Sequence, residues 1–513
     1  MRRNPFYPAV AATGVVAALA GCTCDKKEPE KEKTVPPNIL VFISDDQSFP
    51  YASAYGCTEV STPGFDFVAS HGALFTQAYV TSPGSSPSRA SILTGLYPWQ
   101  IEEAGTHASS FPSRYHCYPD ILEDAGYSVG YTGKGWGPGD WKVSGRRRNP
   151  AGTEFNELTT TPPYSGISKI DYAANFKKFL DRVPAGRPFC FWLGPNEPHR
   201  GYQKDSWKST SHSLSEVRVP GYLPDADVVK GDILDYAVEI EWADSHLMAA
   251  IRELESRGLL ENTLIVALAD NGMAFPHAKA NCYDAGLHVP LAVCWMGHIR
   301  SGQTISQEVS TIDLLPTFLD AAQVDRHYDY AFSGKTLLPS LTGERPLFSP
   351  RPSLSGRERH SSARPGNLGY PIRSYRSGDY LLIWNFHPER WPAGDPQVLK
   401  EDGSLGEMHK AYFDIDGSPT LTYMENHREE DGVFPYFMAA TALRNEFELY
   451  NVVQDPDCMK DLAGDKDFLS IFTSLKGKLF ESLKETGDSR LGDNPKIWES
   501  YPRLSGPMRN FPI

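Results

Sequence analysis

Four short apolar runs, each followed by polar residues, constrain the fold of this chain more than any other feature. They are rich in β-branched and aromatic side chains and span residues 38–44, 127–131, 188–193 and 263–269. Patterns of helical period alternate with them, at residues 62–70, 118–125, 171–182 and 233–257. Such alternation is typical of an α/β sheet covered by helices on both faces. The sequence therefore predicts an α/β fold.

The amino-acid composition changes near residue 345, where Pro, Arg, Ser and Gly become frequent. Beyond this point, alternating apolar residues at 380–386 and 447–452 indicate a smaller, mainly antiparallel sheet, and residues 467–486 indicate a closing helix. We therefore predict a larger α/β domain over residues 37–345. We predict a smaller α+β domain over residues 346–513.

The N-terminus has the pattern of an export signal. Two arginines precede an apolar run over residues 9–20 that is too short for a comfortable membrane span, and Leu-Ala-Gly-Cys follows, ending at Cys22. This ending resembles the bacterial lipobox, which predicts a signal peptide over residues 1–21 and a lipidated Cys22. A plain signal peptide with a chance cysteine is the alternative. Residues 22–36 are rich in Lys, Glu and Pro and predict a flexible tether. We expect an exported, membrane-anchored lipoprotein, periplasmic or at the cell surface.

Charge and cysteine usage narrow the function. The formal net charge is -14, so the chain as a whole does not attract polyanions, and we expect no nucleic-acid partner. If the substrate is an anion, the positive charge that binds it must be local. Apart from Cys22 and Cys24, the cysteines are scattered without a Cys-x-x-Cys pair, which argues against zinc and leaves disulfide pairing unassigned.

Two of the predicted strands end in oxygen-rich pairs. Asp45 and Asp46 follow the first apolar run, and Asp270 and Asn271 follow the last. Open α/β sheets bind ligands beyond the carboxyl ends of their strands, so both pairs could meet at one hard cation. Carboxylate and amide oxygens suit Ca²⁺ or Mg²⁺ better than zinc. The alternative for each pair alone is that it caps the following segment.

The stretch from Ser85 to Gly95 reads as a helix whose first turn can hold an anion. Pro87 suits the first helical position, Arg89 adds a cation one turn in, and Gly95 suits the stop. Backbone N–H groups at a helix start favour sulfate or phosphate. An ordinary serine cap explains the same residues. Three further polar side chains follow predicted strands and could face the same site, although each alone suits a surface or structural role: Lys134, His199 and Lys279.

These residues together resemble the type I sulfatases of the alkaline phosphatase superfamily. The family signature is Cys or Ser, any residue, Pro, Ser, Arg, four residues, then Thr-Gly, and it stands complete from Ser85 to Gly95. The resemblance extends over most of the chain after residue 36. It implies a large mixed sheet between helices and a C-terminal subdomain that contributes to the substrate pocket. Within the family, residues 198–200, 270–276 and 370–373 are most similar to the heparan N-sulfatases (N-sulfoglucosamine sulfohydrolases).

The resemblance also implies a chemistry. Ser85 would be oxidised to formylglycine (3-oxoalanine) by a radical-SAM maturase before export, and its hydrate would attack sulfur. Arg89 would steady this residue, Lys134 and Lys279 would neutralise sulfate oxygens, and His199 would protonate the leaving group. Ca²⁺ would be held by Asp45, Asp46, Asp270, Asn271 and the modified Ser85. One position departs from the family: a histidine usually follows the lysine by two residues, and here that position is Trp136. His107 or His277 could replace it.

The expected substrate is a sulfated glycosaminoglycan oligosaccharide, with the N-linked sulfate of glucosamine in heparin or heparan sulfate as the target. The candidate residues for binding it are Arg200, Arg357, Arg359 and His360. An O-sulfatase on glucosamine or another sulfated glycan is a close alternative. A phosphatase or phosphonate hydrolase of the same superfamily is another, and the complete signature argues against it. The missing histidine motivates a third, a glycan-binding lipoprotein without catalytic activity.

Overall fold

The structure is a computed structural model that describes residues 35–324, 332–345 and 351–504. The described residues from Pro36 onward belong to one compact unit. The predicted signal peptide, Cys22 and nearly all of the predicted tether lie outside the described residues, and the division at residue 345 stays a prediction. Among the described residues, no helix is both long enough and apolar enough to cross a membrane.

The larger sheet has eight strands in the order β5-β4-β6-β1-β7-β8-β2-β9. Its central pairs are parallel, and β8 runs antiparallel to both β7 and β2. The strands are β1 (Asn38–Ser44), β2 (Ala73–Phe75), β4 (Ser128–Gly133), β5 (Thr153–Glu154), β6 (Phe189–Gly194), β7 (Thr263–Ala269), β8 (Leu291–Cys294) and β9 (Gln303–Ile305). A separate short pair joins β3 (Ala78–Tyr79) and β10 (Val309–Ser310).

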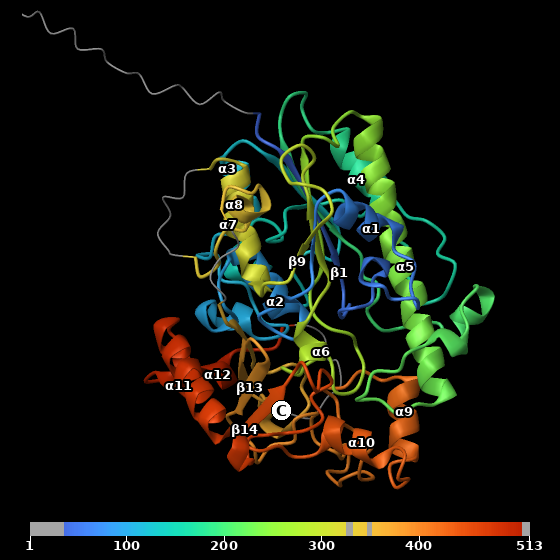
Figure 1. Ribbon diagram of the computed structural model, residues 1–513, viewed down its shortest axis with the longest axis vertical. Helices are drawn as coiled ribbons and strands as arrows, with labels where there is room; N and C mark the ends of the chain where they lie inside the picture. Colours follow the sequence, from blue (N-terminus) through green and yellow to red (C-terminus); the bar gives the residue numbers. More distant parts are fainter. Residues whose placement is uncertain (1–34, 325–331, 346–350, 505–513) are drawn as a thin grey trace, which may run out of the picture. The chain divides into compact units, whose positions relative to one another are not determined.

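Helices cover both faces of this sheet because the buried strands point successive apolar side chains to opposite sides. In β1, Ile39, Val41 and Ile43 face one core, and Leu40 and Phe42 face the other. The first core is closed by α2 (Ser85–Thr94), α3 (Tyr118–Asp124), α7 (Leu314–Ala321) and α8 (Leu338–Leu341), and the second by α1 (Pro63–Ser70), α4 (Tyr172–Leu180) and α5 (Asp227–Ser256). Figure 1 shows the two groups of helices on either side of the sheet.

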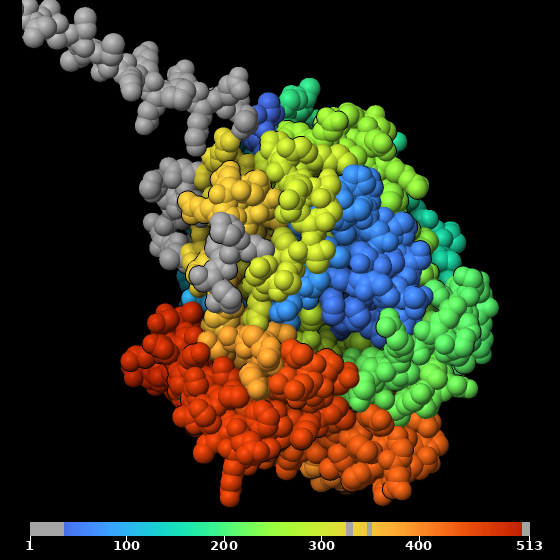
Figure 2. Space-filling view, in the orientation of Figure 1, coloured from blue at the N-terminus to red at the C-terminus, as the bar shows by residue number. Residues whose placement is uncertain are grey.

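The C-terminal part forms a second, four-stranded antiparallel sheet in the order β11-β12-β13-β14. Its strands are β11 (Ser353–Arg357), β12 (Ile372–Ser377), β13 (Tyr380–Asn385) and β14 (Phe447–Asn451). The remaining helices are α6 (Asp284–Leu287), α9 (Pro419–Asn426), α10 (Phe434–Thr441), α11 (Leu469–Glu485) and α12 (Ile497–Ser500). In Figure 2 this part of the chain, orange to red, forms a continuous region of the surface. The predicted architecture of a helix-covered mixed sheet with a smaller antiparallel sheet is confirmed.

Two local predictions needed correction. The helix predicted over 233–257 begins six residues earlier, at Asp227. Pro87 is not the first residue of α2, which begins at Ser85 after an extended Gly84. Gly95 does end this helix, in the left-handed conformation that favours glycine. The six cysteines that the structure describes are free and buried.

Candidate active site

The two acidic pairs lie side by side because β1 and β7 are neighbours in the same register. Ser44 pairs with Ala269, so the residues that follow them leave the sheet together. The Asp46 amide donates to Asp270 Oδ1 (3.0 Å), and Asn271 Nδ2 donates to Asp46 Oδ1 (2.8 Å). Among the described residues, one group of three acidic side chains has ligand atoms within 4.8 Å of one another: Asp45, Asp46 and Asp270. Their buried carboxylates could hold a hard cation.

Helix α2 brings Ser85 to these strand ends. Ser85 is its first residue, and its Oγ donates to Asp45 Oδ1 (2.9 Å) and approaches Asn271 Oδ1 at 3.4 Å. One turn later, Ser88 Oγ donates to the carbonyl oxygen of Asp270 (2.5 Å). The helix is buried along its whole length, so its start is fixed against both strands. Ser85 therefore meets the acidic cluster.

Arg89 connects α2 to the acidic cluster through ion pairs. Its Nε donates to Asp270 Oδ2 (2.7 Å), its Nη1 donates to the carbonyl oxygen of Lys134 (2.7 Å), and its Nη2 lies 3.5 Å from Asp45 Oδ1. Arg89 is fully buried. Burial alone would lower the pKa of its guanidinium, but Asp270 and Asp45 outweigh it and raise the pKa. Arg89 thus stays charged and holds the helix, Asp270 and the Lys134 loop together.

Two lysines reach the same cluster from different loops. Lys134 follows β4 directly, and its Nζ donates to both carboxylate oxygens of Asp45 (2.8 and 2.6 Å). Lys279 comes from the loop after β7, and its Nζ lies 2.6 Å from Asp46 Oδ2 and 3.3 Å from Asp416 Oδ2. Burial would lower the pKa of Lys279, but Asp416 and Asp46 raise it above its usual value. Both ammonium groups therefore border the acidic cluster.

Burial and the neighbouring cations compete at each carboxyl group, and the net pKa shifts of Asp45 and Asp270 have opposite directions. Burial would raise the pKa of Asp45, but the cations of Lys134 and Arg89 hold it well below its usual value. Burial raises the pKa of Asp270 to about 6, against the attraction of Arg89. Strongly perturbed groups that share one site are typical of functional centres.

His199 follows β6 and approaches the cluster from the open side. Its Nδ1 lies 3.0 Å from the carbonyl oxygen of Arg200. A carbonyl only accepts, so Nδ1 carries the proton in this contact and Nε2 remains available. Nε2 lies 3.9 Å from Asp46 Oδ2. His199 can therefore exchange a proton at Nε2 with a group bound in the site.

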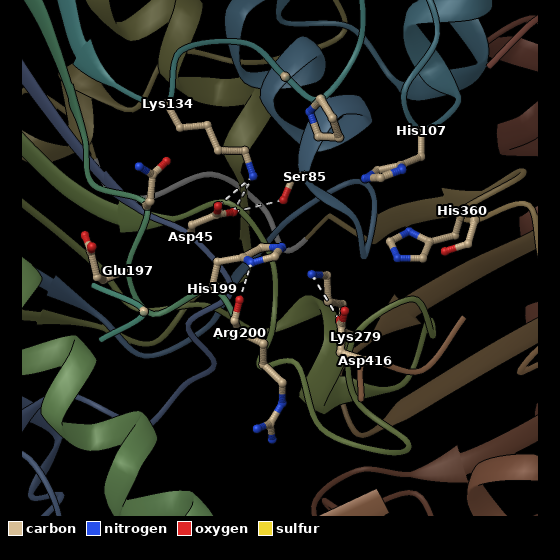
Figure 3. A pocket seen from close by; sticks show the side chains of 15 residues that line it. Asp45, Ser85, His107, Lys134, Glu197, His199, Arg200, Lys279, His360 and Asp416 are labelled. Carbon is tan, nitrogen blue, oxygen red and sulfur yellow. Dashed lines mark hydrogen bonds and ion pairs between the residues drawn. The ribbon is translucent and has the colours of Figure 1, made fainter. Parts of the chain in front are cut away.

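A pocket of about 370 Å³ opens over this cluster (Figure 3). Eight of the residues singled out in the sequence line it: Asp45, Ser85, His107, Lys134, His199, Arg200, Lys279 and His360. Sequence reasoning gave no role to Glu197, although it neighbours His199, or to Asp416 and Ser361, which lie on C-terminal loops without a recognisable motif. Asp46, Asp270, Asn271 and Arg89 lie buried beside Ser85 and Asp45 rather than in the pocket wall.

The predicted substrate arginines bind protein groups instead. Arg200 forms a two-pronged ion pair with Asp232 (2.7 and 2.9 Å), and Figure 3 shows its guanidinium directed away from Ser85. Arg357 pairs with Asp414 (2.5 Å), and Arg359 donates to the carbonyl oxygen of Tyr501 (2.7 Å). Arg357 and Arg359 are not among the pocket-lining residues. The structure therefore places these guanidinium groups in the supporting wall.

Trp136 is buried and does not line the pocket, so it does not take the proton-transfer role of the family histidine. Its indole Nε1 donates to the carbonyl oxygen of Ser86 (3.0 Å), and its ring packs edge-on against Phe111. Of the two histidines proposed in its place, His277 contacts the carbonyl oxygens of Ala439 and Asp457 and does not line the pocket. His107 does line it.

Comparisons with known proteins agree with this geometry. The sulfatase family model matches residues 37–324, more than half of the chain. N-sulphoglucosamine sulphohydrolase from Homo sapiens is 26% identical over 490 residues, covering 88% of this chain and 91% of that protein. N-acetylglucosamine-6-O-sulfatase from Bacteroides thetaiotaomicron is 26% identical over 426 residues, covering 64% and 75%.

A solved structure of an enzyme in complex with its substrate, D-glucosamine-2-N,6-O-disulfate, superposes with a TM-score of 0.62. It is 19% identical and covers 90% of this chain and 99% of its own, so this likeness concerns the fold. The family match includes Ser85, both acidic pairs, both lysines and His199. The chain belongs to the sulfatase family.

Proposed function

We propose that this sulfatase removes the N-linked sulfate of glucosamine in heparin or heparan sulfate. The observation that carries the proposal is the convergence of Ser85, an acidic cluster and two lysines on one pocket. The similarity to human N-sulphoglucosamine sulphohydrolase over nearly the full length of both proteins supports the N-linked target.

The acidic cluster fits a calcium ion. Its oxygens come from two strand ends, they are buried, and they are hard ligands of the kind Ca²⁺ prefers; Ser85 at the start of α2 lies beside them. The proposed ligands are Asp45, Asp46, Asp270, Asn271 and residue 85. When bound, the ion supplies positive charge beside the reacting oxygen and favours its ionised form.

Ser85 is the proposed site of conversion to formylglycine by a radical-SAM maturase. Its Oγ already contacts Asp45 and Asn271, so a hydroxyl on this carbon lies next to the proposed ion. The modified side chain supplies a hydrated aldehyde as nucleophile, which serine itself does not offer. Arg89 is the proposed positioning residue, because its ion pair with Asp270 fixes α2.

The remaining site residues suit the transfer of a sulfuryl group. Lys134 and Lys279 carry ammonium groups on either side of Ser85 and would bind sulfate oxygens as negative charge develops. In its imidazolium form, with Nδ1–H donating to the carbonyl of Arg200, His199 would transfer the Nε2 proton to the departing nitrogen. A sulfamate needs this proton because an amide-like anion is a poor leaving group.

Substrate binding is reassigned in part. His360 lines the pocket and remains a proposed contact to the sugar. Arg200, Arg357 and Arg359 are proposed to position the pocket wall, since their guanidinium groups are engaged by Asp232, Asp414 and Tyr501.

Sulfate release from defined sugars tests the substrate. Matured protein is incubated separately with N-sulfoglucosamine and glucosamine-6-O-sulfate, with a Ser85→Ala variant as control. We expect release from the first sugar and none from the variant. Release only from the second sugar would favour an O-sulfatase, which the similarity to the Bacteroides thetaiotaomicron 6-O-sulfatase supports.

The mass of the peptide that contains Ser85 tests the modification. In protein from the native host, we expect this peptide to be lighter by two hydrogen atoms, as oxidation of an alcohol to an aldehyde requires. An unmodified serine together with glycan binding would favour the binding protein without catalytic activity.

We also propose that Cys22 is lipidated and that the mature protein is displayed from a membrane by its tether. The basis is the sequence pattern of residues 1–36. Metabolic labelling with a fatty acid, compared between the natural chain and a Cys22→Ser variant, tests this; equal labelling would contradict it.

A further inference from the structure

Two imidazoles form the pocket wall next to Ser85. The rings of His107 and His360 lie 4.4 Å apart between centroids, tilted by 37°. Both rings lie against Gly84, the residue before Ser85: a Cβ on Gly84 would come within 3.1 Å of His360 Nδ1 and 3.9 Å of His107 Cδ2. Because residue 84 has no side chain, the two imidazole rings can pack against its backbone. Figure 3 shows the His107 ring directed toward Ser85.

The backbone around His107 is fixed to the start of α2. The Ala108 amide donates to Ser86 Oγ (2.9 Å), and the His107 amide donates to the carbonyl oxygen of Arg359 (3.2 Å). The C-terminal segment adds a third tie, from the Leu504 amide to the carbonyl oxygen of Ala108 (2.6 Å). His107 is therefore held in register with Ser85 and is 5% exposed.

Arg503 determines which nitrogen of His107 carries the proton. Its Nη1 donates to the carbonyl oxygen of His360 (2.7 Å) and lies 3.5 Å from His107 Nδ1. A guanidinium has no acceptor, so Nδ1 presents its lone pair to Arg503 and the neutral ring carries its proton on Nε2. Burial, followed by the charges of His360 and Arg503, lowers the pKa of His107 well below its usual value. The ring is therefore neutral near pH 7.

Nε2 lies on the pocket side of the ring. It is bonded to Cδ2, the ring atom that a Cβ on Gly84 would approach at 3.9 Å, whereas Nδ1 lies 3.5 Å from Arg503 Nη1. The pocket that His107 lines is shared with Ser85, Lys134 and Lys279. Its N–H therefore points into the space where a tetrahedral anion would meet the two ammonium groups.

We infer that His107 is a fixed, neutral hydrogen-bond donor to an oxygen of the sulfuryl group held beside residue 85, and that Arg503 is the positioning residue that sets its tautomer. The inference rests on the proposed function for the identity of that group. A neutral donor strengthens binding of the charge that develops during transfer without adding a further cation that would retain the sulfate dianion. Because its lone pair faces Arg503, His107 does not accept a proton from residue 85, and it does not replace the histidine absent at Trp136.

Three variants separate donation from mere packing. His107→Leu removes the donor, His107→Gln restores an N–H near the position of Nε2, and Arg503→Met releases the tautomer. His427→Leu, at a half-buried histidine that does not line the pocket, is the matched control. Each variant is matured, its residue 85 peptide is checked by mass, and its folding is checked by thermal unfolding. The measurements are kcat and KM on N-sulfoglucosamine and the affinity for inorganic sulfate in the presence of Ca²⁺.

We expect His107→Leu to lower kcat roughly 100-fold, as loss of one oxyanion donor does elsewhere, and to weaken sulfate binding about tenfold. His107→Gln should recover most of both losses, and His427→Leu should change neither. If His107→Leu keeps kcat and sulfate affinity within about twofold of a wild type that releases sulfate, the inference is overturned.

A spectroscopic readout tests the tautomer without reference to activity. In ¹⁵N-histidine-labelled protein, we expect one imidazole that carries its proton on Nε2 and does not titrate near neutral pH, and that is missing in His107→Gln. In Arg503→Met this imidazole should begin to titrate. Protonation of His107 at Nδ1 in the wild type would overturn the inference even if the enzyme is active. If the wild type releases no sulfate from any sulfated sugar, the proposed function fails instead, and sulfate affinity and the ¹⁵N spectrum still decide the role of His107.

Discussion

Replacing Lys134 with methionine is expected to tighten the binding of a divalent cation while abolishing sulfate release. Lys134 Nζ donates to both carboxylate oxygens of Asp45, at 2.8 and 2.6 Å. Asp45 is also one of the three carboxylates that can hold a metal ion. A bound cation must therefore compete with the ammonium group for the same oxygens. Methionine has a similar length without the charge, so the variant removes the competitor.

The magnitude follows from the bonds that are exchanged. A hydrogen bond to a charged group contributes about 1.5–3 kcal/mol, and each 1.4 kcal/mol is a tenfold change in affinity. Removing Lys134 should therefore tighten Ca²⁺ binding about 10- to 100-fold. Without metal, the variant leaves the buried Asp45 carboxylate with one partner fewer, which costs about 3–5 kcal/mol of stability. Calcium should restore most of that loss.

Thermal unfolding and calorimetric titration with Ca²⁺, after removal of metal with a chelator, measure both quantities. Lys142→Met is the matched control, because Lys142 is an exposed lysine in the segment after β4 and does not line the pocket. The competition argument fails if Lys134→Met binds Ca²⁺ no more tightly than the wild type. It also fails if the metal-free variant is as stable as the wild type.

Two further predictions concern stability. Burial raises the pKa of Glu239 in α5 to about 8, so between about pH 4.5 and 8 the folded state holds a proton that the unfolded state has lost. Stability should fall by up to about 1.4 kcal/mol per pH unit as pH rises through that window, and Glu239→Gln should remove this slope. Trp136→His should lower the free energy of unfolding by about 2–4 kcal/mol and not accelerate sulfate release, because the buried indole packs on Phe111 and donates to Ser86.

Denaturant unfolding at pH 5, 6.5 and 8 measures the slope, with Glu255→Gln on the exposed face of α5 as control. An unchanged slope in Glu239→Gln would contradict the role of burial. If Trp136→His is as stable as the wild type and releases sulfate faster, the packing role of the Trp136 indole is contradicted.

The central strands were predictable from the sequence because they are buried on both faces and read as continuous apolar runs. β1 and β7 have the predicted bounds. Edge strands such as β5, with two residues, leave no periodic signal. The sequence placed the start of α5 too late, because Gly231 disfavours a helix interior. In the structure, Gly231 lies inside the helix and packs close to the Trp207 indole. Tertiary packing outweighs local propensity there.

The site residues were predictable where a reactive side chain directly follows a recognisable strand or starts a recognisable helix. Asp45 and Asp270 follow strands, and Ser85 starts a helix with a specific signature, so their sequence positions already indicate one edge of the sheet. The arginines were not predictable in the same way. Whether Arg357 faces substrate or protein depends on Asp414, far along the chain, and sequence alone does not show that pairing. The tautomer of His107 likewise depends on Arg503.

The charges around Ser85 decide what this acidic protein would need in order to bind a sulfate. At pH 7 the carboxylates exceed the cations by one charge; the groups are Asp45, Asp46, Asp270 and Asp416 against Arg89, Lys134 and Lys279. Because the whole chain has a net charge of -14 and the site itself is negative, the site repels anions. A divalent ion held by Asp45 and Asp46 would reverse the local sign, and by sharing their oxygens it would free the two ammonium groups to face the ligand. Sulfate affinity should therefore depend on Ca²⁺, and equal affinity after chelation would contradict this account.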